Sequence, residues 1–297
     1  MPAGYKGTGM QIIPLAAESL GVRSMCTHVA TKDCRVLIDP GVRVVNYRYG
    51  LKPHPLEIFS RRKLFDRIVN YAADSDIVII THFHEAHYTQ EFKEIYRNKI
   101  LLLKNPNHHV TLEQRKEAFD FITKIRDLCE EIHFVDGQSK VYGETELVFS
   151  EPVQHGGDEP FGHILQCAIE DDSGKFLFTS DINGPAHEDA KPFIIKQDPE
   201  ILYLDGPVTF TSYEGSREAL REQLERLIHL LEETRIARLI LDHHVLRDIL
   251  WKEKMSPLFA FTEDRGIHVL TAAEFRGEEN QMLEARRDRL YKEEPPG

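Results

Sequence analysis

The chain alternates between short apolar runs and longer segments whose apolar residues recur at helical spacing. Runs such as 77–80 and 175–179 are rich in aliphatic, β-branched or aromatic side chains, which is typical of buried strands. Segments such as 56–73 and 216–233 place apolar residues on one face and charged residues on the other, as amphipathic helices do. Strands dominate the first half of the chain and recur after residue 131, with helices between and after them.

The pattern also places the remaining elements. The other predicted strands are 11–15, 23–29, 35–38, 99–104, 131–135, 145–149, 162–170, 201–204, 236–241 and 267–270. The other predicted helices are 111–130, 246–261 and 272–291. Thr111 to Gln114 has the spacing of a capping box, and 42–55, which has no period, is expected to be an ordered loop.

Two strand-rich halves that each add helices predict an α/β protein built as a sandwich of two sheets covered by helices. We expect a single domain over residues 10–297 with a helix near its C-terminal end. Residues 1–9 are small and polar, and we interpret them as a natural extension or a remnant of cloning.

Composition narrows the class of protein and of partner. Of the 297 residues, 41% are hydrophobic and 29% are charged, which is typical of a globular protein. The formal net charge of −12 disfavours binding to nucleic acid or to an anionic membrane, and no apolar run predicts a membrane span or a signal peptide. The cysteines have no CxxC spacing and indicate reduced thiols, so we expect a cytoplasmic protein with a small-molecule substrate. A homo-oligomeric state stays open.

Three histidines follow the apolar run 77–80 within a few residues of one another. His82 and His84 are two residues apart, so in extended backbone they point to the same side. His87 follows the end of the strand and can approach the same point from another direction. Because histidine is the commonest side-chain ligand for borderline metals, this spacing predicts a metal site.

Other strands also end in carboxylates or imidazoles, which is where functional residues gather in layered α/β proteins. These residues are Asp39, His155, Asp181, Asp205, His243 and His244. One metal could be held by His82, His84, His155 and an oxygen of Asp181. A second could be held by His87, by Asp181 as a bridge, and by His243 or His244, of which we favour His244. Such donors suit zinc, iron or manganese, and two adjacent metals can hold a hydroxide between them.

These residues resemble those of the metallo-β-lactamase superfamily. The family signature HxHxDH is matched by residues 82–87, and Leu37-Ile38-Asp39-Pro40-Gly41 resembles an early strand-end Asp motif. His155, Asp181 and the pair at 243–244 follow in the family's order for the third, bridging and last ligands. The resemblance spans roughly residues 10–270, and is nearest to an uncharacterised, mainly archaeal branch of predicted metal-dependent hydrolases. It implies a four-layer αβ/βα sandwich with a metal site on its upper edge.

One position departs from the signature. The motif aspartate, which in the family ligates the second metal and orients the attacking hydroxide, is Ala86 here. Glu85 is adjacent but is expected to point the other way. The first metal therefore keeps all its expected ligands, whereas the second lacks one.

Three residues are candidates for supporting roles. Asp39 and Asp205 could each hydrogen-bond a ligand histidine or simply terminate a strand. Arg48 lies in the polar aromatic loop before the histidine motif. This loop is either a solvated surface or a substrate wall in which Arg48 binds an anionic group.

The residues and the resemblance together predict a metal-dependent hydrolase with one or two metals, zinc first, or iron or manganese. A metal-bound hydroxide would attack an ester, amide, thioester or phosphodiester, with Asp181 and His244 as catalytic residues. Two alternatives stay open: a mononuclear iron oxygenase acting on a sulfur substrate, and a catalytically weakened relic of the fold, because Ala86 replaces the motif aspartate.

Overall fold

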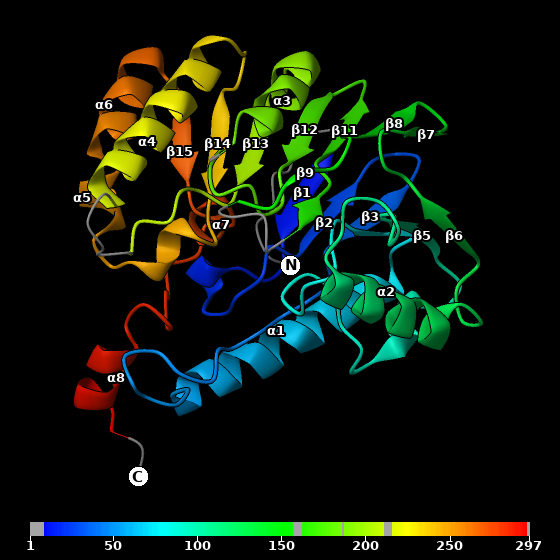
Figure 1. The fold of residues 1–297 in the computed structure, drawn as a ribbon, viewed down its shortest axis with the longest axis horizontal. Coiled ribbons are helices and arrows are strands. Elements are labelled where there is room, and N and C mark those ends of the chain that lie inside the picture. Colours follow the sequence, from blue (N-terminus) through cyan, green and yellow to red (C-terminus); the bar gives the residue numbers. More distant parts are fainter. Residues whose placement is uncertain (1–8, 157–161, 186, 211–215, 296–297) are drawn as a thin grey trace.

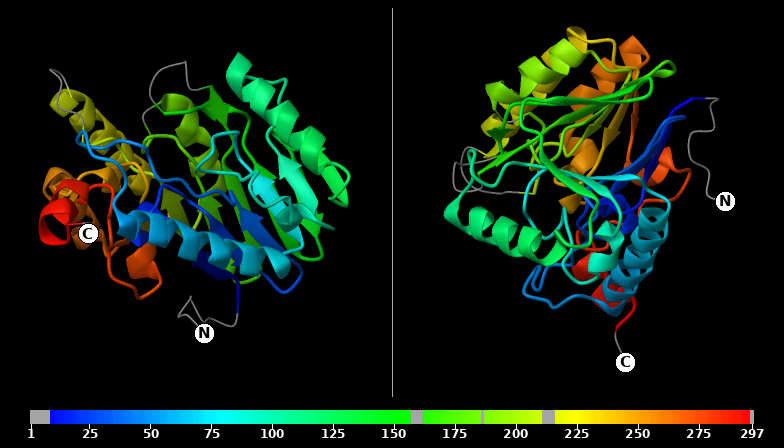
Figure 2. Two further views of the ribbon diagram at one scale, coloured as in Figure 1. Left: turned by 90° about the horizontal axis from the view of Figure 1, so that it is seen from below. Right: turned by 90° about the vertical axis from the view of Figure 1, so that its right-hand side faces the viewer.

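The computed structural model describes residues 9–156, 162–185, 187–210 and 216–295. Two β-sheets lie face to face, and helices cover their outer faces (Figures 1 and 2). One cluster of buried side chains joins the two sheets, bringing Val36 and Ile79 together with Phe176 and Ile240. A second cluster lies on the outer face of the sheet that contains Leu177 and Leu239, and fills the space between that face and the helices that cover it. The predicted sandwich of helix-covered sheets is confirmed.

The first sheet has the strand order β1-β2-β3-β4-β5-β6. Its strands are β1 (Gln11–Pro14), β2 (Thr27–Ala30), β3 (Arg35–Ile38), β4 (Ile77–Ile80), β5 (Ile100–Leu103) and β6 (Glu131–Phe134). β1 to β3 are antiparallel and β3 to β6 are parallel. The helices α1 (Pro55–Ala73) and α2 (Leu112–Ile125) lie on the outer side (Figure 1). All four residues of β4 are buried, as its continuous apolar run predicts.

The second sheet has the order β15-β14-β13-β12-β11-β8-β7. Its strands are β7 (Ser139–Tyr142), β8 (Thr145–Phe149), β11 (Cys167–Asp171), β12 (Gly174–Phe178), β13 (Ile201–Leu204), β14 (Arg238–Leu241) and β15 (His268–Leu270). β12 to β15 are parallel, and the rest of the sheet is antiparallel. The helices α3 (Lys191–Gln197), α4 (Ser216–Glu232) and α6 (Ser256–Arg265) cover it (Figure 1). Val153–Gln154 and His163–Ile164 pair as the short strands β9 and β10.

The loops that follow β4 and β12 meet between the two sheets. Thr81 Oγ1, directly after β4, lies 2.7 Å from Ser180 Oγ, just after β12. The amide of Leu165 donates to the carbonyl of Thr81 at 3.1 Å. The ends of parallel strands from both sheets are thereby joined, and residues far apart in sequence share one edge of the sandwich.

Two predicted helices are interrupted. The segment 246–261 forms α5 (Trp251–Lys254) and then α6, because Pro257 at the start of α6 has no N–H to continue the earlier helix. The segment 272–291 forms only α7 (Ala272–Phe275) and α8 (Arg287–Glu293). Gly277, at a φ of 73°, follows the end of α7, where the backbone turns into the left-handed region.

The predicted strand 162–170 is also divided, into β10 and β11. The residues between the two strands leave the ladder because Leu165 instead hydrogen-bonds the loop after β4. The sequence pattern did not predict α3 or the edge strand β7. None of the helices in the described ranges combines the length and the apolar character needed to cross a bilayer.

The C-terminal segment packs back on the first half of the chain. Arg287, which is fully buried, donates through Nε and Nη2 to the two carboxylate oxygens of Glu57 at 2.8 and 2.7 Å. Its remaining donors reach the carbonyls of Val45 and Leu51. Glu57 also accepts from the backbone of His54 and so caps α1. The expected loop 42–55 is therefore held in place by a residue near the opposite end of the chain.

Candidate metal centre

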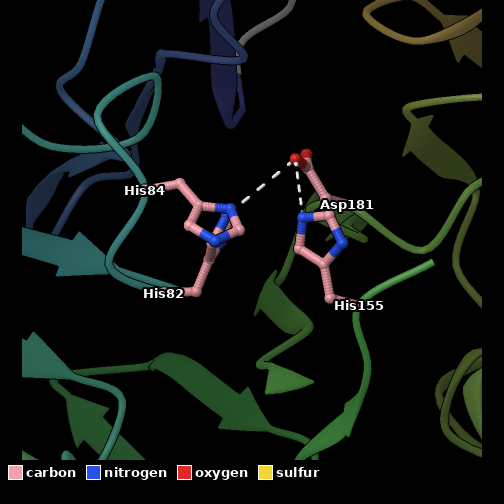
Figure 3. A group of neighbouring side chains, drawn as sticks. All are labelled: His82, His84, His155 and Asp181. Carbon is pink, nitrogen blue, oxygen red and sulfur yellow. Dashed lines mark ion pairs between the residues drawn. The ribbon is translucent and has the colours of Figure 1, made fainter. Parts of the chain in front are cut away.

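The histidine and aspartate residues predicted from the sequence converge at one edge of the sandwich. His82 and His84 come from the loop after β4, His155 from the segment after β9, and Asp181 from the loop after β12 (Figure 3). One ligand atom from each of the four lies within 4.8 Å of those from the other three. His82 Nε2 is 3.9 Å and His155 Nε2 is 3.4 Å from Asp181 Oδ2. We call these four residues the first half of the centre.

A second group forms around the same aspartate. The ligand atoms of His87, His243 and Asp181 lie within 4.8 Å of one another. His87 Nε2 is 3.2 Å and His243 Nε2 is 3.6 Å from Asp181 Oδ2, and His244 Nε2 is 3.7 Å from the same oxygen. We call His87, Asp181 and the two adjacent histidines the second half. Asp181 belongs to both halves, which is the position that a bridging ligand would occupy.

Two buried carboxylates fix the orientation of histidine rings. His87 Nδ1 lies 2.8 Å from Asp39 Oδ2, and His244 Nδ1 lies 2.7 Å from Asp205 Oδ2. An Nδ1–H that donates to a carboxylate leaves Nε2 as the nitrogen with a free lone pair, which is the usual arrangement around a metal-binding histidine. In both rings this Nε2 faces Asp181.

The supporting carboxylates are themselves held. Asp39 accepts from the backbone amide of Thr81 at 2.8 Å and from its hydroxyl at 2.7 Å. Asp205 accepts from the backbone amides of Asn183 and Gly184 at 2.7 and 3.2 Å. The structure therefore gives both aspartates the hydrogen-bonding role that was one of the two interpretations of their position at strand ends.

The adjacent histidines 243 and 244 have different surroundings. His244 has its Nδ1 on Asp205, so its Nε2 is directed by a carboxylate. His243 instead has its Nε2 2.9 Å from Nη2 of Arg247, so the lone pair that a metal would need accepts a guanidinium hydrogen. The ligand atoms of His243 group with those of His87 and Asp181, whereas those of His244 group with Asp181 and Asp205.

The electrostatics of the site favour neutral imidazoles. Burial lowers the pKa of His84 and His243 to about 3, and holds the pKa values of His82 and His244 well below the ordinary range. Burial alone would raise the pKa of Asp181, but the surrounding histidines outweigh it and hold it well below its usual value. Neutral imidazoles and an ionised carboxylate are the protonation states that bind a metal.

His87 behaves differently from the other rings. Burial opposes its protonation, yet the carboxylates of Asp181 and Asp39 outweigh burial and raise the pKa of His87 to about 10. This shift favours the protonated ring, in which Nε2 also carries a hydrogen that faces Asp181. A cation held by His87 and Asp181 would take the place of that proton.

Two buried polar atoms show that the donor set fits a metal. His82 Nε2 and Asp181 Oδ1 are buried and have no hydrogen-bond partner among the residues that the structure describes. Such orphaned groups are costly in a protein interior unless a ligand satisfies them. Three imidazoles and one carboxylate around one point are a complete ligand set for a four-coordinate zinc, and they also suit iron or manganese.

The alanine at position 86 leaves the second half incomplete. Ala86 lines the cavity beside the centre but has no ligand atom to offer. Glu85 does not replace it, because its largely exposed carboxylate lies 3.3 Å from Nε of Arg43. The second half therefore has His87 and Asp181, with a late histidine, and no further carboxylate from the motif.

A cavity of about 760 Å³ opens beside the two halves. The residues that line it include His84, His87, His155, Asp181, His243, His244, Arg23, Arg43, Arg247, Glu113 and Glu117. Arg48, which one interpretation placed at the substrate wall, is not one of the lining residues. It donates to the backbone carbonyl of Arg247 at 2.9 Å and stacks on the rings of Tyr49 and Phe210. Arg48 thus contacts the backbone of a residue that lines the cavity, without lining the cavity itself.

Sequence reasoning missed several residues of the site. Gln114 was assigned to a capping box with Thr111, but only the Thr111 half forms, with Oγ1 accepting from the amide of Gln114. The side-chain amide nitrogen of Gln114 lies 3.0 Å from His84 Nε2 instead, so Gln114 contacts a candidate ligand ring. Arg23 and Arg247 also gave no signal, because a single arginine in a loop or a short helix has no distinctive spacing.

The relatives of the chain carry a family name. It is 38% identical over 292 residues to the UPF0282 protein MJ1629 of Methanocaldococcus jannaschii, covering 95% of this chain and 96% of the relative. It is 39% identical over 292 residues to a UPF0282 protein of Sulfurisphaera tokodaii, covering 96% and 94%. The chain belongs to the UPF0282 family. A comparison with protein-family models found no match.

Solved structures with the same fold are remote in sequence. Unliganded yeast PDE1 superimposes with a TM-score of 0.53 at 11% identity, covering 89% of the UPF0282 chain and 98% of PDE1. An isothiocyanate hydrolase from Delia radicum gut bacteria gives 0.50 at 13% identity, covering 84% and 94%. CmlA, a diiron β-hydroxylase from Streptomyces venezuelae, gives 0.51 at 12% identity, covering 83% and 51%. The UPF0282 chain has the metallo-β-lactamase fold, as the resemblance predicted.

Proposed function

We propose that this UPF0282 protein is a metal-dependent hydrolase that acts on an ester, amide, thioester or phosphodiester bond of a small molecule. The observation that carries the proposal is the convergence of His82, His84, His155 and Asp181 on one point at the wall of a cavity. A cavity of about 760 Å³ lies within the range of small-molecule sites, roughly 300–1,000 Å³. The isothiocyanate hydrolase with the same fold supports a hydrolytic use of this architecture.

A divalent metal bound here would lower the pKa of a coordinated water towards neutrality and polarise the oxygen of the scissile group. The chain's own residues prepare that chemistry. His82 and His84 stay neutral because they are buried, and Asp181 stays ionised because histidines surround it. Asp39 holds the ring of His87 in place, which lets the centre form without reorienting that side chain.

His244 is the late histidine that we propose as a ligand. Its Nδ1 is fixed on Asp205, and its Nε2 lies 3.7 Å from Asp181 Oδ2. The matching nitrogen of His243 accepts from Arg247 instead. We propose zinc as the resident metal because imidazole-rich sites with one carboxylate suit it, with iron or manganese as the other metals that this donor set accepts.

Metal analysis tests the proposal directly. We expect the purified full-length protein to contain tightly bound metal, to lose it to a strong chelator, and to regain both metal and hydrolysis of generic nitrophenyl esters or bis-nitrophenyl phosphate when zinc or manganese is restored. A protein without bound metal that also takes none up would contradict the proposal. Iron content together with oxygen consumption in the presence of a thiol would instead favour the oxygenase alternative.

A further inference from the structure

We propose that Arg23 and Arg247 form an anion-binding subsite beside the metal centre, which receives a carboxylate or phosphoryl group of the substrate. The inference rests on the proposed function only for its location, next to the reacting bond. Binding of an anion by two guanidinium groups requires no turnover. The shared chemistry is a compact oxyanion with two or more oxygens, which matches the planar donor fork of arginine.

Arg23 is fixed by an ion pair that uses only some of its hydrogen-bond donors. Its Nε and Nη2 donate to the two carboxylate oxygens of Glu284, each at 2.6 Å, as a bidentate pair. Its backbone pairs with that of Arg43 in an isolated bridge. Within the described ranges, Nη1 of Arg23 donates to no protein acceptor. The side chain lines the cavity and stays 22% exposed, so those hydrogens are available to a ligand.

Arg247 is placed in a similar way. Its Nε donates to Glu18 at 2.8 Å, and its Nη2 reaches His243 Nε2 at 2.9 Å. Nη1 of Arg247 has no protein acceptor among the described residues, and the side chain lines the same cavity. Arg48 fixes the backbone of Arg247 by donating to its carbonyl. Both guanidinium groups are therefore oriented before any ligand arrives, which reduces the entropy lost on binding.

The local charges favour an anion at this wall. Three arginines, Arg23, Arg48 and Arg247, share two buried carboxylates, Glu18 and Glu284, so the group has one more arginine than carboxylate. In a partly buried wall this surplus is screened less than it would be on the surface. An anion that accepts from the free Nη1 groups would balance it.

The rest of the cavity indicates how a substrate would be oriented. Glu113 and Glu117, both from α2, supply negative charge to the lining. Arg43, the third arginine of the cavity, is already paired with Glu85. A substrate with one anionic group would therefore direct it away from α2 and towards Arg23 and Arg247.

The subsite adjoins the centre. Arg247 Nη2 is 2.9 Å from His243 Nε2, which is itself 3.6 Å from Asp181 Oδ2. The anionic group bound there would lie only a few bonds from the bond that is hydrolysed. The inferred substrate class is thus a compact molecule with a carboxylate or phosphoryl group close to its reactive ester, amide or thioester.

Calorimetry with inorganic phosphate and with malonate tests the subsite on the metal-loaded, full-length protein. The test variant combines Arg23→Gln with Glu284→Gln, which removes both charges and keeps two side chains that can hydrogen-bond each other. The matched control is Arg61→Gln, which removes an arginine paired with Glu91 outside this cavity. We expect the test variant to bind the preferred anion about tenfold more weakly or worse, with unchanged metal content, and the control to bind it as the parent does.

The outcomes separate the two proposals. Preference for phosphate or for malonate identifies the source of the oxyanion, and binding of neither by the parent overturns the subsite. Equal affinity in parent and test variant also overturns it. If the double variant fails to melt cooperatively, Arg23→Lys replaces it: this change keeps the charge but removes the fork, so a several-fold loss supports the subsite and none overturns it. Failure to take up metal contradicts the hydrolase proposal alone, because the same anion titration is then read on the metal-free protein and needs no turnover.

Discussion

The two halves of the metal centre share Asp181 but differ in how fully they are built. In the first half, His82, His84 and His155 surround the aspartate, and each ligand atom lies within 4.8 Å of the others. In the second half, the motif position that should add a carboxylate is Ala86, and the nitrogen of His243 nearest Asp181 is engaged by Arg247. The same fold therefore offers one site of four donors and one site of three, in which the motif carboxylate is absent and the nitrogen of the third donor accepts from Arg247.

If the centre binds metal as we propose, the residue at position 86 sets how many metals bind, and the first half binds one metal without it. A carboxylate at 86 would serve only the second half, since the first half is complete without it. The expectation is a protein with one tightly held metal and a second, weaker position. The predictions below test this inequality, beginning with the change that should abolish both positions.

Asp181→Asn should have the largest effect, because the residue serves both halves. The amide keeps the size of the side chain but loses the negative charge that five neighbouring histidines surround. We expect metal affinity to fall by more than about 100-fold and hydrolysis to disappear with it. Elemental analysis of the purified variant measures its metal content. The control is Asp172→Asn, which changes an exposed aspartate. Full metal content in Asp181→Asn would refute the arrangement in which both halves share Asp181.

Alanine substitutions at 243 and 244 compare the two late histidines. His244→Ala removes the ring that Asp205 orients, so we expect it to weaken metal binding by about 10- to 100-fold. His243→Ala removes a ring whose nitrogen already accepts from Arg247, and it should weaken binding several-fold at most. Competition titrations with a chromogenic chelator give both values. The reverse order would make His243 the ligand and require Arg247 to move aside.

Ala86→Asp should have a smaller effect, confined to the second half. The new carboxylate lies beside His87 and should raise the metal content from about one towards two per chain, with affinity at the weak position improving about tenfold. Ala86→Asn is the matched control, since it has the same shape without the charge. If the parent already binds two metals with equal affinity, the inequality between the halves is wrong. If the parent is inactive and Ala86→Asp alone is highly active, the parent is the weakened relic.

Much of the fold could be predicted because the core strands are continuous apolar runs. The prediction 77–80 matches β4 exactly, and 216–233 differs from α4 by one residue. The failures occur where a local event outweighs periodicity. Pro257 starts a new helix inside a single apolar pattern, and the contact of Leu165 with Thr81 divides one strand into two. Neither effect can be read from hydrophobic spacing. The first arises because proline has no backbone N–H, and the second arises from one hydrogen bond between residues far apart in sequence.

The candidate site also has features that the sequence predicts and features that it does not. The strand-end positions of His82, Asp181 and His244 were predictable, since parallel strands deliver their loops to one edge. The contacts between side chains were not. Nδ1 of His244 contacts the carboxylate of Asp205, whereas Nε2 of His243 contacts the guanidinium group of Arg247. Nothing in the sequence of two adjacent histidines distinguishes these environments.

The packing of the C-terminal segment has a consequence for the order in which the protein is assembled during synthesis. A ribosome completes the last of the candidate ligands, His244, before it adds Glu284 and Arg287. The arginine wall at residue 23 and the loop that Arg287 holds must therefore wait for them, even when both sheets are already present. A nascent chain that ends before residue 284 would contain every candidate metal ligand and still lack the finished wall of the cavity.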